Sequence, residues 1–385
     1  MRRLLVLASV MVFFDVTFFS AISPLLPEYK SEFGLSKGGA GILAGAYAAG
    51  TLIASLPAGW LATRIGSRRT VIGGLLLLGA ASIVFGFGHQ IVLLDAARFV
   101  QGIAGALIWA GALTWLIAQT PVERRGSVIG TALGAAVAGA LVGPAFGALA
   151  AEIGTEIVFG GVLVAALVLA YYASSMPETA EPERQSLREV ASRIMSRPVV
   201  NSTAFVTAPS VMFGAVEVLV PLRIDDLGGG HTLIATGFIA GAGLEAVLAP
   251  IAGRYSDRVG RRGPYVAGMA ICAVAMGGLA LAETLGLELS MLIMTSLGAG
   301  ICFTPALTSL SEAAEEIGLH QGYAGGLSNM AWAMGQVVGA LAGGAIAGAL
   351  GNVPPSFAIS ALLIVTAAYA YRTLSAFPAG EPSVA

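Results

Sequence analysis

Long apolar segments alternate with short polar breaks along almost the whole chain. A helix of about 20 residues, rising 1.5 Å per residue, is long enough to cross the bilayer core of about 30 Å. The pattern predicts twelve such helices, at 4–27, 39–62, 70–88, 91–118, 126–152, 155–174, 199–224, 232–254, 264–283, 287–313, 321–349 and 355–375. We therefore expect an all-α membrane protein with twelve transmembrane helices.

The long polar interval at 175–198 divides these helices into two sets of six. It predicts an N-terminal six-helix bundle (1–174), a cytoplasmic linker (175–198) and a C-terminal six-helix bundle (199–385). Glycines and arginines recur between the halves at a shift of 194 residues, pairing Gly59 with Gly253, Arg64 with Arg258, Gly66 with Gly260 and Arg68 with Arg262. A shift of 196 lays Gly139 and Gly143 on Gly335 and Gly339. An even number of helices per half makes these parallel repeats, an arrangement that transporters use.

Composition and charge indicate which class of protein this is and how it lies in the membrane. The chain is 56% hydrophobic and 11% charged, which excludes an ordinary soluble domain. Twelve predicted spans put both termini on the same side of the membrane, and that side receives 16 of the 20 Lys and Arg residues. The positive-inside rule then places both termini in the cytoplasm, as expected for a multi-pass protein of the plasma (cytoplasmic, inner) membrane.

The same composition argues against other partners and chemistries. The net charge of −2 gives no basic surface for nucleic acid, and the three histidines form no metal-ligand spacing. The sequence shows neither a phosphate-binding glycine loop with its lysine nor a nucleophile–base constellation. We expect no cofactor, no metal and no enzymatic activity, and a monomer surrounded by the lipid bilayer.

Two charged residues lie inside apolar segments, where a charge costs about 2.5–3.5 kcal/mol. Asp15 is near the middle of the first segment and predicts a proton or cation site, with a helix–helix hydrogen bond as the alternative. Arg98 needs a counter-charge: either Asp95, three residues away, or Asp15 in one conformational state. Gln101, one turn further on, could extend a polar track from Arg98.

Further residues are candidates for a substrate cavity between the halves. Glu217 and Glu245 are acids inside C-terminal segments, and contact with rim water or a structural partner is the alternative for both. Tyr47, Trp109 and Trp332 could face an amphipathic substrate. Packing in the core or against lipid explains these aromatic residues equally well.

Two related loops follow the second and eighth helices. They contain Gly59-Trp60-Leu61-Ala62-Thr63-Arg64-Ile65-Gly66-Ser67-Arg68-Arg69 and Gly253-Arg254-Tyr255-Ser256-Asp257-Arg258-Val259-Gly260-Arg261-Arg262. Glycine permits a tight turn and close helix approach, and arginines at this rim can cap helix C-termini. The paired loops resemble the signature loop of the major facilitator superfamily. The resemblance implies that an acid in the loop helps latch the cytoplasmic gate; Asp257 occupies that position, whereas Thr63 replaces it in the first copy.

The fifth helix carries glycines at steps of four. Gly139, Gly143 and Gly147 make a flat face for backbone contact, and Pro144 should bend the helix. With Gly130 and the Gly-Pro pair in register, the segment resembles the antiporter motif of twelve-helix drug:proton antiporters, except that Ala148 replaces the final glycine.

Two other segments point to the same family. Arg98-Phe99-Val100-Gln101-Gly102 resembles the superfamily's arginine motif, which is linked there to proton transfer. The acid and prolines of the first helix, Asp15-x8-Pro24-x2-Pro27, resemble those of tetracycline exporters and vesicular amine transporters. These resemblances imply roles in proton coupling for Asp15 and Arg98.

The resemblance implies a function. We expect a proton-coupled secondary active exporter, an antiporter of small amphipathic molecules or drugs, whose partners are a small-molecule substrate and protons. A sugar or organic-acid symporter or uniporter of the same fold is the alternative, and a non-transporting membrane receptor is a more distant one. The direction of flux driven by a pH gradient would separate these possibilities.

Overall fold

The computed structural model describes residues 2–121, 124–178, 192–319 and 321–374, and these residues are folded into long helices. The first half contains α1 (Arg2–Ser20), α2 (Ile22–Glu32), α3 (Lys37–Ile65), α4 (Ser67–Phe87), α5 (Ile91–Ala118), α6 (Arg125–Ile153) and α7 (Thr155–Ser174). The second contains α9 (Arg197–Asp226), α10 (His231–Val259), α11 (Arg262–Ala280), α12 (Leu285–Glu316), α13 (Gln321–Leu350) and α14 (Val353–Thr373). Within the described ranges, twelve helical spans are long and apolar enough to cross a membrane, which confirms the predicted fold class.

The first span departs from a simple helix. It runs over Arg2–Glu32, beyond the predicted end at residue 27, and α1 and α2 meet at a break at Ala21. Pro24 lies in the first turn of α2, where a missing backbone N–H is tolerated, and Pro27 lies inside the helix. The first span is therefore divided into two helices just before these prolines.

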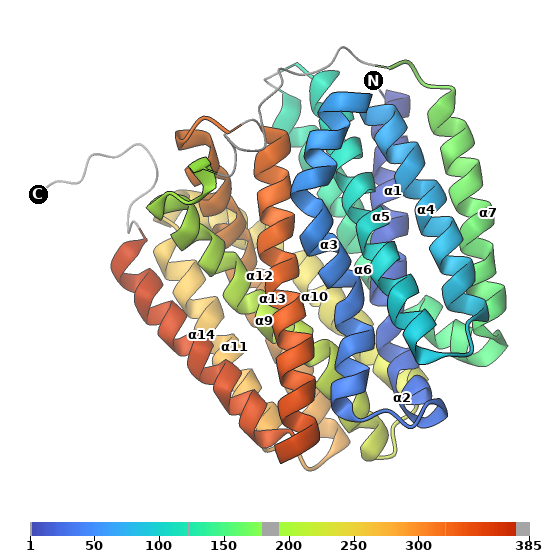
Figure 1. The fold of residues 1–385 in the computed structure, drawn as a ribbon. Coiled ribbons are helices and arrows are strands. Elements are labelled where there is room, and N and C mark those ends of the chain that lie inside the picture. The colour runs from blue at the N-terminus through green and yellow to red at the C-terminus, as the bar shows by residue number, and fades with distance from the viewer. Residues whose placement is uncertain (1, 122–123, 179–191, 320, 375–385) are drawn as a thin grey trace, which may run out of the picture.

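The helices form two groups. Figure 1 shows α1–α7, coloured blue to green, on one side and α9–α14, coloured green to red, on the other. Each group has its own hydrophobic core, and the N-terminal core also takes in Val218, Leu222 and Ala340 from the other half. The exact domain limits stay a prediction, because much of the 175–198 linker and the C-terminal residues 375–385 lie outside the described residues.

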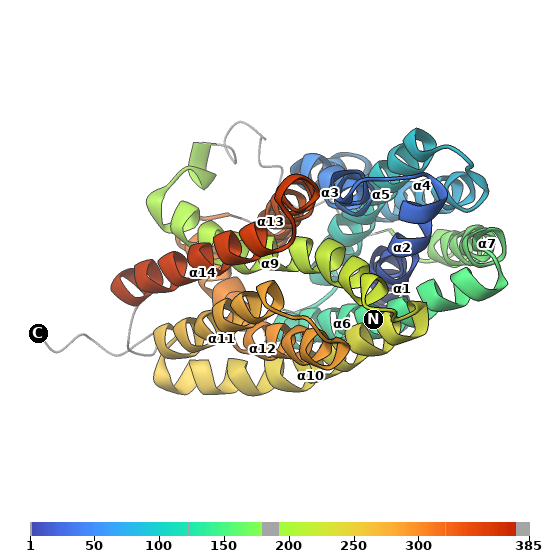
Figure 2. The same cartoon turned by 90° about the horizontal axis from the view of Figure 1, so that it is seen from below.

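Contacts between the halves are made mainly by two helix pairs. Helix α3 packs along α13, and α6 packs along α10, as the view in Figure 2 also shows. Near the start of α3, the backbone of Gly41 meets Ala340, and that of Gly344 meets Lys37, so closely that no side chain fits at either glycine. We call this end of the molecule, which carries the α2–α3 and α13–α14 loops, the distal end.

Polar contacts reinforce closure of the distal end. Lys37 Nζ donates a hydrogen bond to Asn352 Oδ1 at 2.8 Å and lies 3.7 Å from an Asp226 carboxylate oxygen. His231 Nε2 lies 3.4 Å from Glu152 Oε1. All of these contacts join one half to the other, so they hold the two halves together at this end.

The internal repeat predicted from the sequence has a counterpart in backbone geometry. Gly66 and Gly260, at matching positions in the two halves, adopt φ values of +93° and +84°. Only glycine adopts such values without strain, so both predicted turns are confirmed. Gly34 and Gly228 form a second matching pair, with φ of +62° and +84°.

The glycine faces are also used twice. A side chain at Gly139, Gly143 or Gly147 of α6 would overlap backbone carbonyls of the first span. In the second half, a side chain at Gly335 or Gly339 of α13 would overlap carbonyls of α9 in the same way. The predicted close backbone contact is therefore confirmed, and its partner is α1–α2. Pro144 is buried within α6, which continues through it.

Candidate functional site

Asp15 lies where α1, α3 and α5 meet. It is 1% exposed, and both of its carboxyl oxygens accept hydrogen bonds. Tyr47 of α3 donates its hydroxyl to Oδ1 at 2.7 Å, and Trp109 of α5 donates Nε1 to Oδ2 at 3.1 Å. Gly105 of α5 leaves room for this arrangement, because a side chain there would collide with the carboxyl group and the Tyr47 hydroxyl. Two predicted cavity residues thus bind the predicted proton site itself.

Arg98 of α5 is also 1% exposed, and it caps a helix. Its Nη1 and Nη2 donate to the backbone carbonyls of Phe18 and Phe19, each at 3.1 Å. These carbonyls belong to the last turn of α1, where a helix leaves acceptors unsatisfied and carries partial negative charge. The break at Ala21 therefore creates the acceptor site that the arginine fills.

Neither ion pair expected for Arg98 is formed among the described residues. Asp95 Oδ1 is buried without a hydrogen-bond partner, which corrects the expected pair between Asp95 and Arg98. Asp15 is bonded by Tyr47 and Trp109 instead of the guanidinium. The reason is geometric: the broken end of α1 offers the guanidinium two carbonyl acceptors. Pairing with Asp15 in another conformational state stays a prediction.

Tyr47 connects the two charged residues. Its hydroxyl binds Asp15, while the Arg98 Cζ atom lies 5.1 Å from the centre of its ring. Arg98 Nη1 also donates to Gln101 Oε1 at 3.2 Å, and Gln101 Nε2 donates to Ser82 Oγ of α4 at 3.0 Å. The predicted polar track through Gln101 therefore exists, and Ser82 is a member that the sequence did not reveal.

The site reaches the other half through aromatic rings and charge. The ring of Phe19 lies 5.0 Å from that of Tyr47 and 5.1 Å from that of Trp332 in α13. Glu217 of α9 is 8% exposed, and electrostatic attraction joins it to Arg98 across the interface. Trp332 and Glu217 thus border the same site.

Glu245 lies apart from this group. It is half-buried in α10, and its backbone packs against Gly300 of α12. Its backbone therefore packs within the C-terminal half, and its role in a substrate cavity stays a prediction.

Two arginines of the paired loops, Arg68 and Arg262, bond to carbonyls at helix ends. Arg68 donates to the Met176 carbonyl at 2.9 Å and pairs with Glu178 at 3.2 Å, just beyond α7. Arg262 occupies the matching place in the second half, donating to the Tyr371 carbonyl at 3.4 Å in the last turn of α14. Arg64 stacks on the ring of Trp60, with its Cζ atom 4.7 Å from the ring centre.

The rest of the second loop is held within its own half. Asp257 is exposed and attracts Arg261, which forms an ion pair with Glu312 of α12. Burial lowers the pKa of Arg261, and Asp257 partly offsets this effect. Gly253 faces Thr304 of α12, and Arg258 is exposed.

In the first loop, Thr63 stands where the family signature has an acid, and it takes part in a contact between the halves. Tyr323 of α13 lies against Gly59 and is hydrogen-bonded to Thr63. Thr63 also donates to the Trp60 carbonyl at 2.8 Å. Thr63, which takes the place of the loop acid, therefore touches the opposite half, while Asp257 interacts electrostatically with Arg261 of its own half.

Glu288 is a buried acid that was not among the candidates predicted from the sequence. It lies in the first turn of α12 and is 2% exposed. In the sequence it stands at the start of a predicted span, where acids usually belong to exposed loops. Within the described part of the chain, no group of three or more His, Cys, Asp and Glu side chains could hold a metal ion.

Twelve spans in two repeated halves, with buried charged residues at their junction, define a secondary transporter built from parallel repeats. The chain belongs to the Major Facilitator Superfamily, whose family model matches residues 7–325.

Individual relatives extend this assignment. The chain is 26% identical over 365 residues to the chloramphenicol resistance protein of Streptomyces lividans, covering 92% of each protein. It is 36% identical to the MFS-type transporter ppzB of Metarhizium rileyi over 85 residues, which are 22% of this chain and only 18% of that relative. The crystal structure of a D-xylose-proton symporter shares the fold, with a TM-score of 0.79, 15% identity, and coverage of 97% and 98% of the two chains.

Proposed function

We propose that this transporter is a proton-coupled exporter, an antiporter that exchanges protons for small amphipathic molecules. The observation that carries the proposal is the buried carboxyl group of Asp15, bonded by Tyr47 and Trp109 and close to the capped guanidinium of Arg98. An ionisable group at this depth marks an ion pathway by default. The proposed orientation places both termini in the cytoplasm and the distal end outside, in the plasma membrane.

The geometry suggests how binding and movement are linked. In this conformation Asp15 is closed off from water, so proton exchange requires a second conformation that exposes it. Arg98 holds the broken end of α1, and α2, beyond the break, packs against α9 and α10 of the other half. A shift of α2 during rocking would therefore disturb the Arg98 cap and the nearby Glu217. We infer that Arg98 then becomes free to pair with Asp15, which releases the proton.

The energy available suits this scheme. One elementary charge moving through 100 mV is worth about 2.3 kcal/mol, which is enough for a more than tenfold substrate gradient. Substrate entering from the cytoplasmic side would displace the proton, and reprotonation from outside would favour the return step.

Two observations favour export over the alternative. The α6 glycine face with its Gly-Pro pair, which resembles the antiporter motif, packs on the same span that carries Asp15. The relative from Streptomyces lividans, matched over 92% of its length, is named a chloramphenicol resistance protein. A sugar or organic-acid symporter is the second candidate, because a D-xylose-proton symporter has the same fold.

A transport assay in cells separates these functions. Accumulation of cationic, zwitterionic and neutral amphiphiles is measured in cells with and without the protein, in the presence and absence of an uncoupler. An exporter lowers the accumulation of at least one compound, and the uncoupler abolishes the difference. Proton-driven inward accumulation of a sugar or organic acid would favour symport, and no flux of any compound would point to a receptor.

A further inference from the structure

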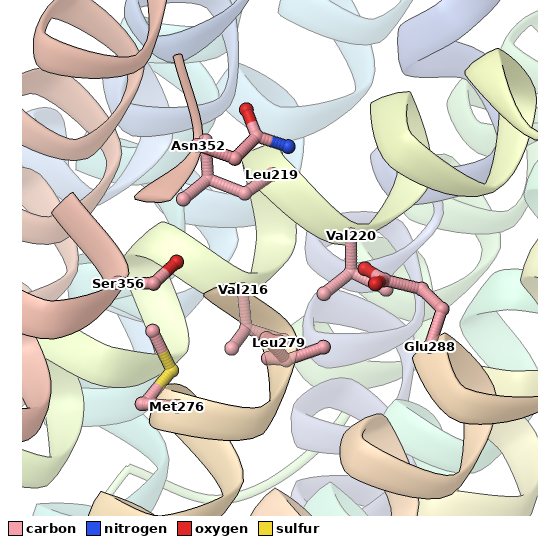
Figure 3. Close-up of a pocket in the computed structure, with 8 residues that line it drawn as sticks. All are labelled: Val216, Leu219, Val220, Met276, Leu279, Glu288, Asn352 and Ser356. Atoms are coloured by element: carbon pink, nitrogen blue, oxygen red, sulfur yellow. The ribbon is translucent and has the colours of Figure 1, made fainter. Parts of the chain in front are cut away.

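A small cavity lies in the C-terminal half, near the distal end. It has a volume of about 10 Å³ and is enclosed by α9, α11, α12 and the start of α14. Figure 3 shows the residues around it: Val216, Leu219, Val220, Met276, Leu279, Glu288, Asn352 and Ser356. The Glu288 carboxyl group extends toward Val220, and its Oε2 atom is buried without a hydrogen-bond partner.

The size and the donors of the cavity limit what it can bind. About 10 Å³ is close to the smallest volume that accepts one water molecule. Three side chains in the wall offer oxygen atoms, those of Glu288, Asn352 and Ser356, and the Asn352 oxygen already accepts from Lys37. Magnesium and calcium need six or more oxygen ligands. A proton on Glu288, with one water beside it, fits this space better than a metal cation.

The surroundings of Glu288 act in opposite directions on its charge. The walls from α9 and α11 are apolar and disfavour a carboxylate. The N-terminus of α12 and the nearby cation of Arg223 favour it. Arg223 is itself fixed, because its Nε and Nη2 donate to the Ala282 carbonyl at 3.3 and 2.8 Å. Opposing effects of this kind allow the group to gain and lose a proton.

The cavity also touches the closure between the halves. Asn352, in its wall, accepts the 2.8 Å hydrogen bond from Lys37 of the N-terminal half. One water could join the Glu288 carboxylate to the Asn352 amide nitrogen, and the amide oxygen already binds Lys37. Hydrogen-bonded chains strengthen one another, so a negative charge on Glu288 would strengthen the Lys37 contact.

We propose that Glu288 is a second proton-binding site, separate from Asp15, and that its protonation weakens the Lys37–Asn352 contact and so favours opening of the distal end. The proton comes from the solution on the distal side and returns to it when the end closes. The site stands on its own geometry, and only its part in the transport cycle rests on the proposed function.

Infrared titration of the purified protein tests proton binding directly. Difference spectra recorded between low and high pH should contain a carboxylic acid band that is lost in Glu288→Gln. The band should be kept in Glu283→Gln, which changes an exposed acid five residues away in the same way. It should be shifted in frequency in Ser356→Ala, which alters the cavity but keeps the carboxyl group. Identical spectra for wild type and Glu288→Gln would overturn the proposal.

A distance measurement tests the link to opening. Spin labels on Ser31→Cys of α2 and Ser290→Cys of α12, both exposed, report the separation of the halves at the distal end. Lower pH should increase the population with the longer distance, and Glu288→Gln should show that population at every pH. A distance distribution independent of pH, or unchanged by Glu288→Gln, would contradict the link.

The same measurements keep this inference apart from the proposed function. Asp15→Asn should lose coupled transport yet retain the Glu288 band and the pH-dependent distance. If the wild type shows the band but transports no substrate, the proposed function fails and the proton site stands. If transport is proton-coupled and the band is absent, the proton site at Glu288 fails and the proposed function stands.

Discussion

The contact between α6 and α1 predicts opposite effects for two identical substitutions in one helix. At Gly143, an added methyl group would overlap the Thr17 carbonyl and the Ser20 hydroxyl of α1. At Gly130, the same methyl group would meet nothing within 4 Å. Both variants replace one glycine of α6 by alanine, so they differ only in whether the added methyl group meets α1.

The magnitude follows from overpacking and helix propensity. Inserting a methyl group into a packed interface costs about 1–3 kcal/mol. Replacing glycine by alanine inside a helix favours folding by about 0.5–1 kcal/mol. Gly130→Ala should therefore stabilise the protein by about 0.5–1 kcal/mol. Gly143→Ala should be less stable than Gly130→Ala by about 1–3 kcal/mol.

Thermal unfolding of both variants in one detergent measures this difference. The fraction of folded protein is followed by gel filtration after heating. One kcal/mol shifts the midpoint by about 2–4 °C in domains of 150–250 residues, so the midpoint of Gly143→Ala should lie several degrees below that of Gly130→Ala. Equal midpoints, or a higher one for Gly143→Ala, would refute the close packing of α6 on α1.

Three further substitutions test other contacts. Arg98→Lys keeps the charge but cannot donate to both carbonyls of the broken α1 end. The initial transport rate in proteoliposomes should therefore fall at least about tenfold. An unchanged rate would show that transport does not require the bonds from Arg98 to these carbonyls. Lys37→Met removes the bonds to Asn352 and Asp226, so the longer distance between spin labels at Ser31→Cys and Ser290→Cys should become more populated, and a distribution equal to that of Lys37→Arg would contradict this role. Glu312→Gln breaks a partly exposed ion pair, so it should lower the free energy of unfolding by less than about 1 kcal/mol, with a smaller effect at high salt; a larger, salt-independent loss would show that the pair is not exposed.

Much of the fold could be predicted, because membrane helices must satisfy their own backbone hydrogen bonds and are therefore long and apolar. The glycine spacing of α6 also predicted a flat contact face, since residues four apart lie on one side of a helix. The partner of that face could not be read from the spacing. Gly130 shows the limit, because it belongs to the same sequence pattern and yet faces open space.

The site was predictable in its members but not in its bonds. A buried Asp15 and Arg98 suggested an ion pair, and the structure instead gives each of them neutral partners. The outcome depends on the position of the break in the first span, because that break exposes the carbonyls that Arg98 binds. Tyr47 and Trp109 were expected to face substrate or to pack in the core, and no pattern in the sequence indicates that both donate to one carboxyl group.

In the proposed mechanism, the carboxyl group of Asp15 carries the exchanged proton. The most direct test measures substrate-driven proton flux in proteoliposomes containing wild-type protein or Asp15→Asn, with equal amounts of folded protein. We predict that the wild type moves protons against the direction of substrate movement and that Asp15→Asn moves none. Unchanged coupled flux in Asp15→Asn would exclude this role for Asp15.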